Sequence, residues 1–334
     1  QRVEYQDGRG TRFDDVTFWD PDTDTLYFEG DLGAMLGGFM GMYPQFDMPI
    51  AVGLIPLLFQ NGVWMEDAFV GAAVTVPALN SPGLDWSNFD ITLFAGVDQV
   101  SNQGFAGANS GANIIGATTF IEARGGYFEI GYAFLDDPVT HGHSFHNLGM
   151  SYTRRYMNCV SNSVRLILNG GQNGLQNSRT ADGALLLVEN SFLTPWPYNV
   201  IPYVNVFAGF NRPQSAARAG AAGGVLRNTG ILFESDVLTG YPTLDATGHD
   251  TYGAAIGIDL LAPEYTQQLI LEEAILQAFD RTVGRSAPDD QYGVGLRYQV
   301  PISNAHIIRL DAMHGWLENS RDVSGARIEF RWKF

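Results

Sequence analysis

Charged side chains alternate with apolar ones near the carboxyl end of the chain. In Ala326–Phe334 every second residue is Arg, Glu or Lys, and the residues between them are apolar. Similar alternation occurs upstream, and we interpret the whole set as candidate pore-lining residues: Arg165, Arg297, Arg309, Asp311, Arg327, Glu329 and Arg331. Charges of both signs around a watery passage would create a transverse field that orients solutes. The alternative is that they form cross-strand ion pairs in a wall, worth roughly 0.2–1 kcal/mol each.

An acidic segment near the amino end resembles the start of a calcium-binding loop. Asp20, Asp22 and Asp24 occupy alternate positions, as the first ligands of such a loop do. The sixth position, where the loop needs glycine, is Thr25, and Asp31 stands in place of the closing glutamate. The pattern therefore favours a solvated acidic lead-in over a calcium site.

The histidines and the single cysteine give little support for a metal site or an enzyme. His141, His143 and His146 are close enough in sequence to bind zinc or copper, but a polar loop with incidental histidines is the favoured interpretation. Cys159 excludes a disulfide framework within the chain, and it has no histidine nearby in the sequence. The nucleophile, zincin, phosphate-loop and dinucleotide motifs are absent, although the spacing does not exclude a pairing of His146 with Ser151. We expect no enzyme activity, no metal and no cofactor.

Composition and net charge limit the classes of partner that the chain can bind. The chain has 36 acidic and 19 basic residues, a net charge of −17 and a pI near 4.5, which argues against nucleic-acid binding. Most of the excess lies in residues 1–137, which hold 19 acidic and 4 basic residues. Charged residues make up 16% of the chain, against roughly 25% in a soluble domain, yet the mean hydropathy is only −0.05.

Strict alternation in four segments predicts strands between two unlike media. The segments are Tyr252–Leu261, Tyr292–Ile302, Ile308–Ala312 and Ala326–Phe334. Their second face is largely glycine, alanine and scattered charges, which suits a lumen with lipid on the other side. About ten residues per strand matches the 9–11 that a tilted strand needs to cross a bilayer.

Twelve further segments look like strands with less regular alternation. They are Thr25–Gly33, Ile50–Phe59, Asp67–Val76, Phe89–Val97, Asn113–Glu122, Tyr127–Leu135, Asn147–Tyr156, Ser163–Asn169, Ala184–Phe192, Val200–Phe210, Val225–Glu234 and Gln267–Phe279. The sequence therefore predicts an all-β fold, a transmembrane antiparallel up-and-down β-barrel of about 16 strands (range 14–18). We divide the chain into an acidic lead-in, residues 1–23, and one barrel domain, residues 24–334.

Some segments fit this account less well. Gln267–Phe279 fits an amphipathic helix nearly as well as a strand. Leu32–Met65 holds one charge in 34 residues, and Asn211–Gly224 is too long and alanine-rich for a tight turn, so either segment could fill a lumen. A membrane-spanning helix over Met48–Met65 is disfavoured because Pro56 lies at its middle.

The carboxyl end, IEFRWKF, resembles the last strand of Gram-negative outer-membrane β-barrel proteins, and more loosely of porins. The resemblance implies that Phe334, supported by Ile328, Phe330 and Trp332, forms the signal for the barrel assembly machinery. Glu329 stands where that signal often has glycine. The resemblance also implies secretion and insertion into an outer membrane beside phospholipid and lipopolysaccharide. The first residue, Gln1, is compatible with secretion.

Three functions follow as hypotheses. The first is a porin-like channel for passive diffusion of small hydrophilic solutes or ions, with a homotrimer as one oligomeric state. The second is a plugged or narrow structural barrel that anchors a surface layer or a partner complex. The third is a secreted β-sheet protein that binds carbohydrate through its aromatic side chains.

Overall fold

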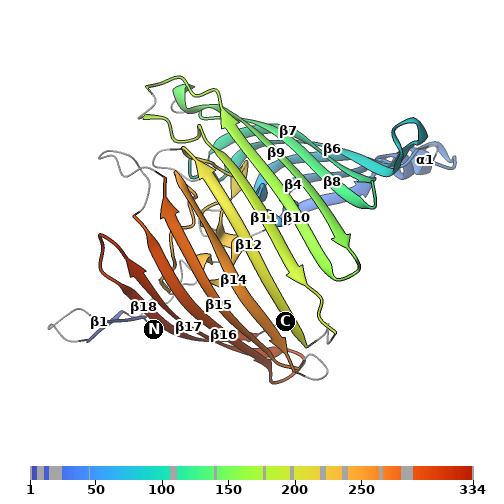
Figure 1. The fold of residues 1–334 in the computed structure, drawn as a ribbon. Helices are drawn as coiled ribbons and strands as arrows, with labels where there is room; N and C mark the ends of the chain where they lie inside the picture. The colour runs from blue at the N-terminus through green and yellow to red at the C-terminus, as the bar shows by residue number, and fades with distance from the viewer. Residues whose placement is uncertain are drawn as a thin grey trace.

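The computed structural model describes residues 2–5, 11–14, 25–44, 46–105, 111–138, 141–175, 178–195, 199–218, 223–234, 240–262, 266–279 and 289–332. One large antiparallel sheet takes up most of these residues and curves around an interior that holds part of the chain (Figure 1). The predicted lead-in contributes a separate two-stranded sheet, β1 (Arg2–Tyr5) with β2 (Thr11–Asp14). The rest of residues 1–24, including the candidate calcium ligands, lies outside the described residues.

The large sheet follows the order of the chain. Its strands are β3 (Leu26–Asp31), β4 (Pro49–Phe59), β5 (Met65–Ser81), β6 (Trp86–Val100), β7 (Ala112–Ala123), β8 (Gly126–Asp136), β9 (Phe145–Tyr156), β10 (Val160–Gly170), β11 (Ala184–Phe192), β12 (Val200–Phe210), β14 (Thr251–Leu261), β15 (Gln268–Ala278), β16 (Gln291–Pro301), β17 (His306–Leu317) and β18 (Val323–Trp332). Each pairs antiparallel with its neighbours, and the two-residue β13 (Ala217–Arg218) joins β5 in parallel, which makes sixteen strands. Among the described residues, β3 and β18 are each paired along one edge only.

The predicted strands are confirmed except for one. Gln267–Phe279, which also fitted a helix, forms β15, and the apolar run of Met48–Met65 contains β4. The strand predicted over Val225–Glu234 is wrong: this segment forms two 3-10 turns, η6 (Arg227–Thr229) and η7 (Ile231–Phe233). Its apolar residues belong to an interior core rather than to a lipid-facing wall, which is why they alternate poorly. Among the described residues, the wall itself has fifteen antiparallel strands, one fewer than the predicted sixteen and within the range of 14–18, because β13 belongs to the connection between β12 and β14.

The remaining helical elements are short. They are α1 (Leu32–Met40), η1 (Gln60–Gly62), η2 (Pro82–Leu84) and η3 (His141–His143). None of the helices among the described residues has the length and apolar composition needed to cross a bilayer.

The two ends of the sheet differ in their connections. At one end, which we call the short-turn end, most strands are joined by brief turns, such as residues 124–125 between β7 and β8 and residues 157–159 between β9 and β10. At the other, the long-loop end, connections such as residues 171–183 and 211–250 are much longer. In outer-membrane barrels short turns face the periplasm and long loops face the exterior.

Side chains on each strand alternate between an outward and an inward face. On β16 and β17 the outward residues Val294, Leu296 and Leu310 are 37–38% exposed, as expected of side chains that meet lipid, whereas the inward Asp311 and Met313 are buried. The inward face is buried because other parts of the chain fold against it. The interior of this sheet is therefore a packed region with its own core.

Candidate functional site

The connection between β12 and β14 is residues 211–250; we call it the inserted loop. Its described residues, 211–218, 223–234 and 240–250, fold into the interior. Its first anchor is Arg218 on β13, which is 3% exposed. The guanidinium donates to the carbonyl oxygens of Gly62, at 2.8 Å, and Gly224, and it lies 3.4 Å from a carboxylate oxygen of Glu66. Burial lowers the pKa of Arg218 to about 10, so it stays charged at neutral pH. The loop is thus tied to the start of β5.

The second anchor is Glu272 on the inward face of β15. Its carboxylate accepts hydrogen bonds from the backbone N–H groups of Ile231 and Leu232, both at 2.9 Å, and from the Tyr203 hydroxyl at 2.5 Å. A buried carboxylate with three donors is well satisfied. Glu272 therefore fixes the η7 turn of the inserted loop against the wall.

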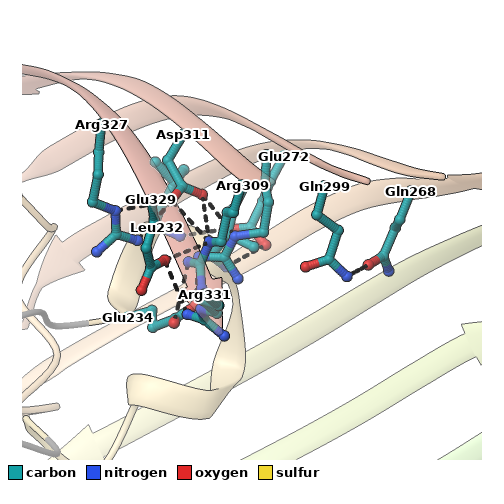
Figure 2. A network of polar contacts seen from close by, with 12 residues as sticks. Leu232, Glu234, Gln268, Glu272, Gln299, Arg309, Asp311, Arg327, Glu329 and Arg331 are labelled. Atoms are coloured by element: carbon teal, nitrogen blue, oxygen red, sulfur yellow. Dashed lines mark hydrogen bonds and ion pairs between the residues drawn. The ribbon is translucent and has the colours of Figure 1, made fainter. Parts of the chain in front are cut away.

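The third anchor is a cluster of arginines and acids on β16, β17 and β18 (Figure 2). Glu234 of the inserted loop lies 2.5 Å from Nη2 of Arg297 and 3.2 Å from Nη2 of Arg309. Burial raises the pKa of Glu234, but the two arginines outweigh it and hold the pKa below its ordinary value. Asp311 in turn accepts from Arg297 at 2.7 Å, Arg309 at 2.8 Å and Arg327 at 2.6 Å. The cluster joins three strands to the loop.

Two apolar clusters fill the interior toward the long-loop end. In the first, Trp64 is fully buried and donates its indole N–H to Asn147 Oδ1 at 2.7 Å. In the second, Leu226 and Phe233 of the inserted loop pack against inward residues of the wall, such as Leu187. These clusters resemble the core of a soluble domain, and they narrow any passage through this half.

A polar cavity of about 680 Å³ lies between the inserted loop and the wall, toward the short-turn end. Wall residues come mainly from the short-turn halves of β8 to β12 and β14 to β16; they include Ser161, Ser163, Arg165, Glu189, Tyr203, Asn205 and Asp259. The loop contributes Arg227, Asn228, Thr229, Gly230, Ile231 and Glu234. Hydroxyls, amides and charged groups together can donate to and accept from a hydrated solute.

The arginines that border the cavity are already paired with acids. Nε of Arg165 lies 2.6 Å from Glu189, and its Nη1 lies 4.0 Å from Glu129. Arg227 lies 3.7 Å from Glu66, and Arg297 is bound by Glu234 as described above. Each positive charge thus has a carboxylate partner. Asp259 and Glu272 also border the cavity, so its described lining holds five acids and three arginines and many hydrogen-bonding groups.

The predicted pore-lining residues fall into three groups. Arg165 and Arg297 border the cavity. Arg309, Asp311 and Arg327 are buried in the ion-pair cluster, whereas Glu329 and Arg331 form a 3.0 Å pair whose side chains are 30% and 48% exposed. All seven share the inward face, and their role in lining a pore stays a prediction.

Sequence reasoning missed Glu272, Glu234 and Glu189, which hold the loop or border the cavity. The signal for Glu272 was present: if Gln268–Ala278 is taken as a strand, Glu272 falls on the same face as Ala274 and Leu276. Glu234 had no such signal because the segment before it was taken for a wall strand.

The other singled-out residues lie apart from the cavity. Ile328, Phe330 and Trp332 are exposed on the outward face of β18, and Phe334 lies outside the described residues, so the assembly signal stays a prediction. His143 lies 3.9 Å from Asp137, and His146 shares a 2.7 Å hydrogen bond with Tyr132. Within the described part of the chain no three potential ligands gather as a metal site. His146 and Ser151 lie on opposite faces of β9, since Ser151 points inward and donates to Glu129.

Comparison with proteins of known structure identifies the fold of the chain. No family model and no curated protein matches the sequence. Among solved structures, Pseudomonas aeruginosa OpdK, in a structure with vanillate, matches with a TM-score of 0.59 at 11% identity, over 85% of this chain and 74% of that one. OccK5 (OpdH) of the same organism matches with a TM-score of 0.55 at 10% identity, over 85% and 77% of the two chains.

A third match is Wzi of Escherichia coli, an outer-membrane protein involved in group 1 capsule assembly and described as a carbohydrate-binding β-barrel. Its TM-score is 0.54 at 13% identity, over 86% of this chain and 68% of Wzi. At these identities the similarity is one of fold. The chain has the fold of outer-membrane β-barrels, which confirms the predicted fold class and the resemblance drawn from the terminal strand.

Proposed function

We propose that this β-barrel is a narrow channel of a bacterial outer membrane that admits small hydrophilic solutes. The observation that carries the proposal is the polar cavity of about 680 Å³ inside the sheet, bordered on one side by the wall and on the other by the inserted loop. The likeness in fold to OpdK and OccK5 supports a channel. The long-loop end would face the exterior, so that solutes meet the packed half first and the polar cavity next.

The charges of the cavity disfavour anions. A solute that enters the cavity meets Arg165 beside Glu189 and Arg297 beside Glu234, and such pairs orient a dipole. In all, the described residues of the lining include five acids and three arginines. Small polyols, zwitterions and cations therefore fit this environment better than anions.

A structural barrel is the second candidate, and the two apolar clusters favour it. Trp64 and Phe233 are fully buried at the packed half of the interior, where a wide porin has water. If this half stays sealed, the protein conducts nothing and serves as an anchor for a surface layer or a partner complex.

Conductance in planar bilayers separates the two candidates. We expect the folded protein to give small, discrete current steps, and liposomes that contain it to admit glucose faster than a trisaccharide. A folded protein that passes neither ions nor glucose would contradict the channel and leave the structural barrel.

A charge substitution tests whether the cavity lies on the path. Glu189→Gln removes the partner of Arg165, so we expect the reversal potential in a salt gradient to move toward anions, with a permeability ratio changed about two- to threefold. Asp182→Asn is the matched control, because Asp182 pairs with Arg212 at 3.2 Å and does not border the cavity. Equal shifts of the reversal potential in both variants would mean that the cavity does not lie on the permeation path.

A further inference from the structure

α1 is a short, capped helix in the connection between β3 and β4, at the short-turn end. Asp31 precedes it, and its carboxylate accepts hydrogen bonds from Ala34 N at 2.5 Å and from Met48 N at 2.6 Å. Gly41 ends the helix in the left-handed region, with φ 67°. Because Asp31 ties the first turn to the returning chain, the segment holds α1 in a fixed orientation.

One face of α1 is closed by the segment itself. A Cβ on Gly33 would lie 1.9 Å from the carbonyl oxygen of Phe46, and one on Gly37 would lie 2.8 Å from that of Met42. The returning chain therefore packs directly on the glycines. On the opposite face α1 presents the large apolar side chains of Met35 and Phe39.

The segment as a whole is exposed and carries no charge. Phe39 of α1 is 91% exposed, and Tyr43 of the returning chain is 93% exposed. Five more apolar residues of the segment are exposed as well: Met35, Leu36, Met40, Met42 and Phe46. Residues 32–46 contain no Asp, Glu, Lys or Arg. An exposed, uncharged apolar segment of this kind marks a contact with a partner or a membrane.

The apolar face is continuous with the lipid-facing side of the sheet. Phe28 and Gly30 lie on the outward face of β3, since they pair with the outward Val52 and Ile50 of β4. The sulfur of Met35 lies within 3.2 Å of the position that a Cβ on Gly30 would take, beside the ring of Phe28. Figure 1 shows α1 projecting from this end of the sheet. None of its described residues belongs to the interior clusters or to the polar cavity.

We infer that α1 is an interfacial anchor, whose apolar face is buried at the boundary between headgroups and acyl chains of the phospholipid leaflet at the short-turn end. A helix in the membrane plane normally combines an apolar face with a basic one. Here the helix lacks basic residues, so its binding depends on apolar burial and needs no anionic lipid. Zwitterionic phospholipid is therefore a sufficient partner.

Spin-label accessibility tests this anchor in the full chain. In a Cys159→Ser background, Phe39→Cys and, separately, Met157→Cys are labelled with a nitroxide and reconstituted into phosphatidylcholine vesicles. Met157 is the matched control: it is 92% exposed, it lies in a turn at the same end, and Arg154 and Arg155 precede it. We expect the ratio of collisions with oxygen to collisions with a water-soluble nickel chelate to be at least about fivefold higher at position 39 than at position 157.

Two results would overturn the inference. A ratio at position 39 equal to that at position 157 would place α1 in water. Low accessibility of position 39 to both reagents would mean that protein covers it. Both labelled proteins must first show the heat-resistant electrophoretic migration of the unlabelled chain, and α1 contributes no strand to the sheet, so the labels are compatible with folding.

Discussion

The two halves of the interior are lined by different kinds of side chain, although the same strands run through both. Toward the long-loop end the inward residues pack on Trp64, Leu226 and Phe233, as they would in the core of a soluble domain. Toward the short-turn end the inward residues are Ser, Asn, Tyr, Arg and Glu around a cavity. The outward face is mostly apolar along both halves, as expected of a face that meets lipid, with Glu273 of β15, which accepts from the Tyr292 hydroxyl, as an exception. An inward residue is thus apolar where an apolar part of the interior packs against it, and polar where it faces the cavity.

Glycines show the difference most directly. Trp64 lies on the wall where a Cβ on Gly131 would come within 2.5 Å of its ring and one on Gly149 within 2.3 Å. Only glycine allows this close approach of a large ring to the strands. In this half, small inward residues thus serve as the surface on which an indole packs.

Removal of the inserted loop should have the largest effect. Replacement of residues 213–248 by a short Gly-Ser linker takes away the loop's share of the two apolar clusters and the residues that cap the cavity, while Trp64 remains. Because a sheet of about sixteen strands encloses an aqueous channel when it is unfilled, we expect single-channel conductance to rise at least about tenfold. Planar-bilayer recording is the measurement.

The deletion also exposes inward apolar residues such as Leu187, so a gentler variant accompanies it. Glu234→Gln weakens one anchor and keeps the shape of the side chain. It should give brief openings to a larger conductance. Unchanged conductance in both variants would mean that the inserted loop does not limit the passage, and the contrast between the halves would have no functional meaning.

Truncation of Trp64 tests the packed half as a core. Trp64→Ala leaves a void beside Gly131 and Gly149 and removes the donor to Asn147, so we expect the free energy of unfolding to fall by about 3–5 kcal/mol. Urea unfolding in detergent micelles, followed by far-ultraviolet circular dichroism, measures the loss. Tyr127→Ala is the counterpart at the polar cavity, where open space already adjoins the ring, and its cost should be clearly smaller. Equal costs would show that the two halves are equally packed.

The sequence predicted the strands of the wall better than the segments inside it, for a physical reason. Lipid imposes a period of two on every strand, so segments such as Tyr292–Ile302 were evident without knowledge of their neighbours. The inserted loop has no such constraint. Val225–Glu234 was taken for a strand because its apolar residues meet a core that only tertiary structure creates. Arg165 and Arg297 could be placed on an inward face by alternation, but their partners Glu189 and Glu234 depend on register and on the path of the loop.

The last prediction concerns acidification of the packed half, where His249 of the inserted loop is partly buried. Burial is the main cause that lowers the pKa of His249 to about 4, and the neighbouring Arg212 lowers it further, although Asp250 and Asp182 act in the opposite direction. The folded protein therefore resists protonation of this ring, while the unfolded chain takes up a proton near pH 6.5. Stability is unaffected by this group above that pH and falls as the pH drops from 6.5 toward 4.

Between pH 7.5 and pH 5 the loss attributable to His249 should be about 2 kcal/mol. His249→Gln removes the titration and keeps a polar group that can still meet Gln214, whose Nε2 lies 3.4 Å from the imidazole Nε2. Urea unfolding at the two pH values should thus show a smaller acid-induced loss in His249→Gln than in the parent, whatever other groups titrate in both. If the two proteins lose the same stability, the ring is accessible to protons in the folded state. The long-loop half would then be wetter than its packing indicates, and the contrast with the polar cavity would weaken.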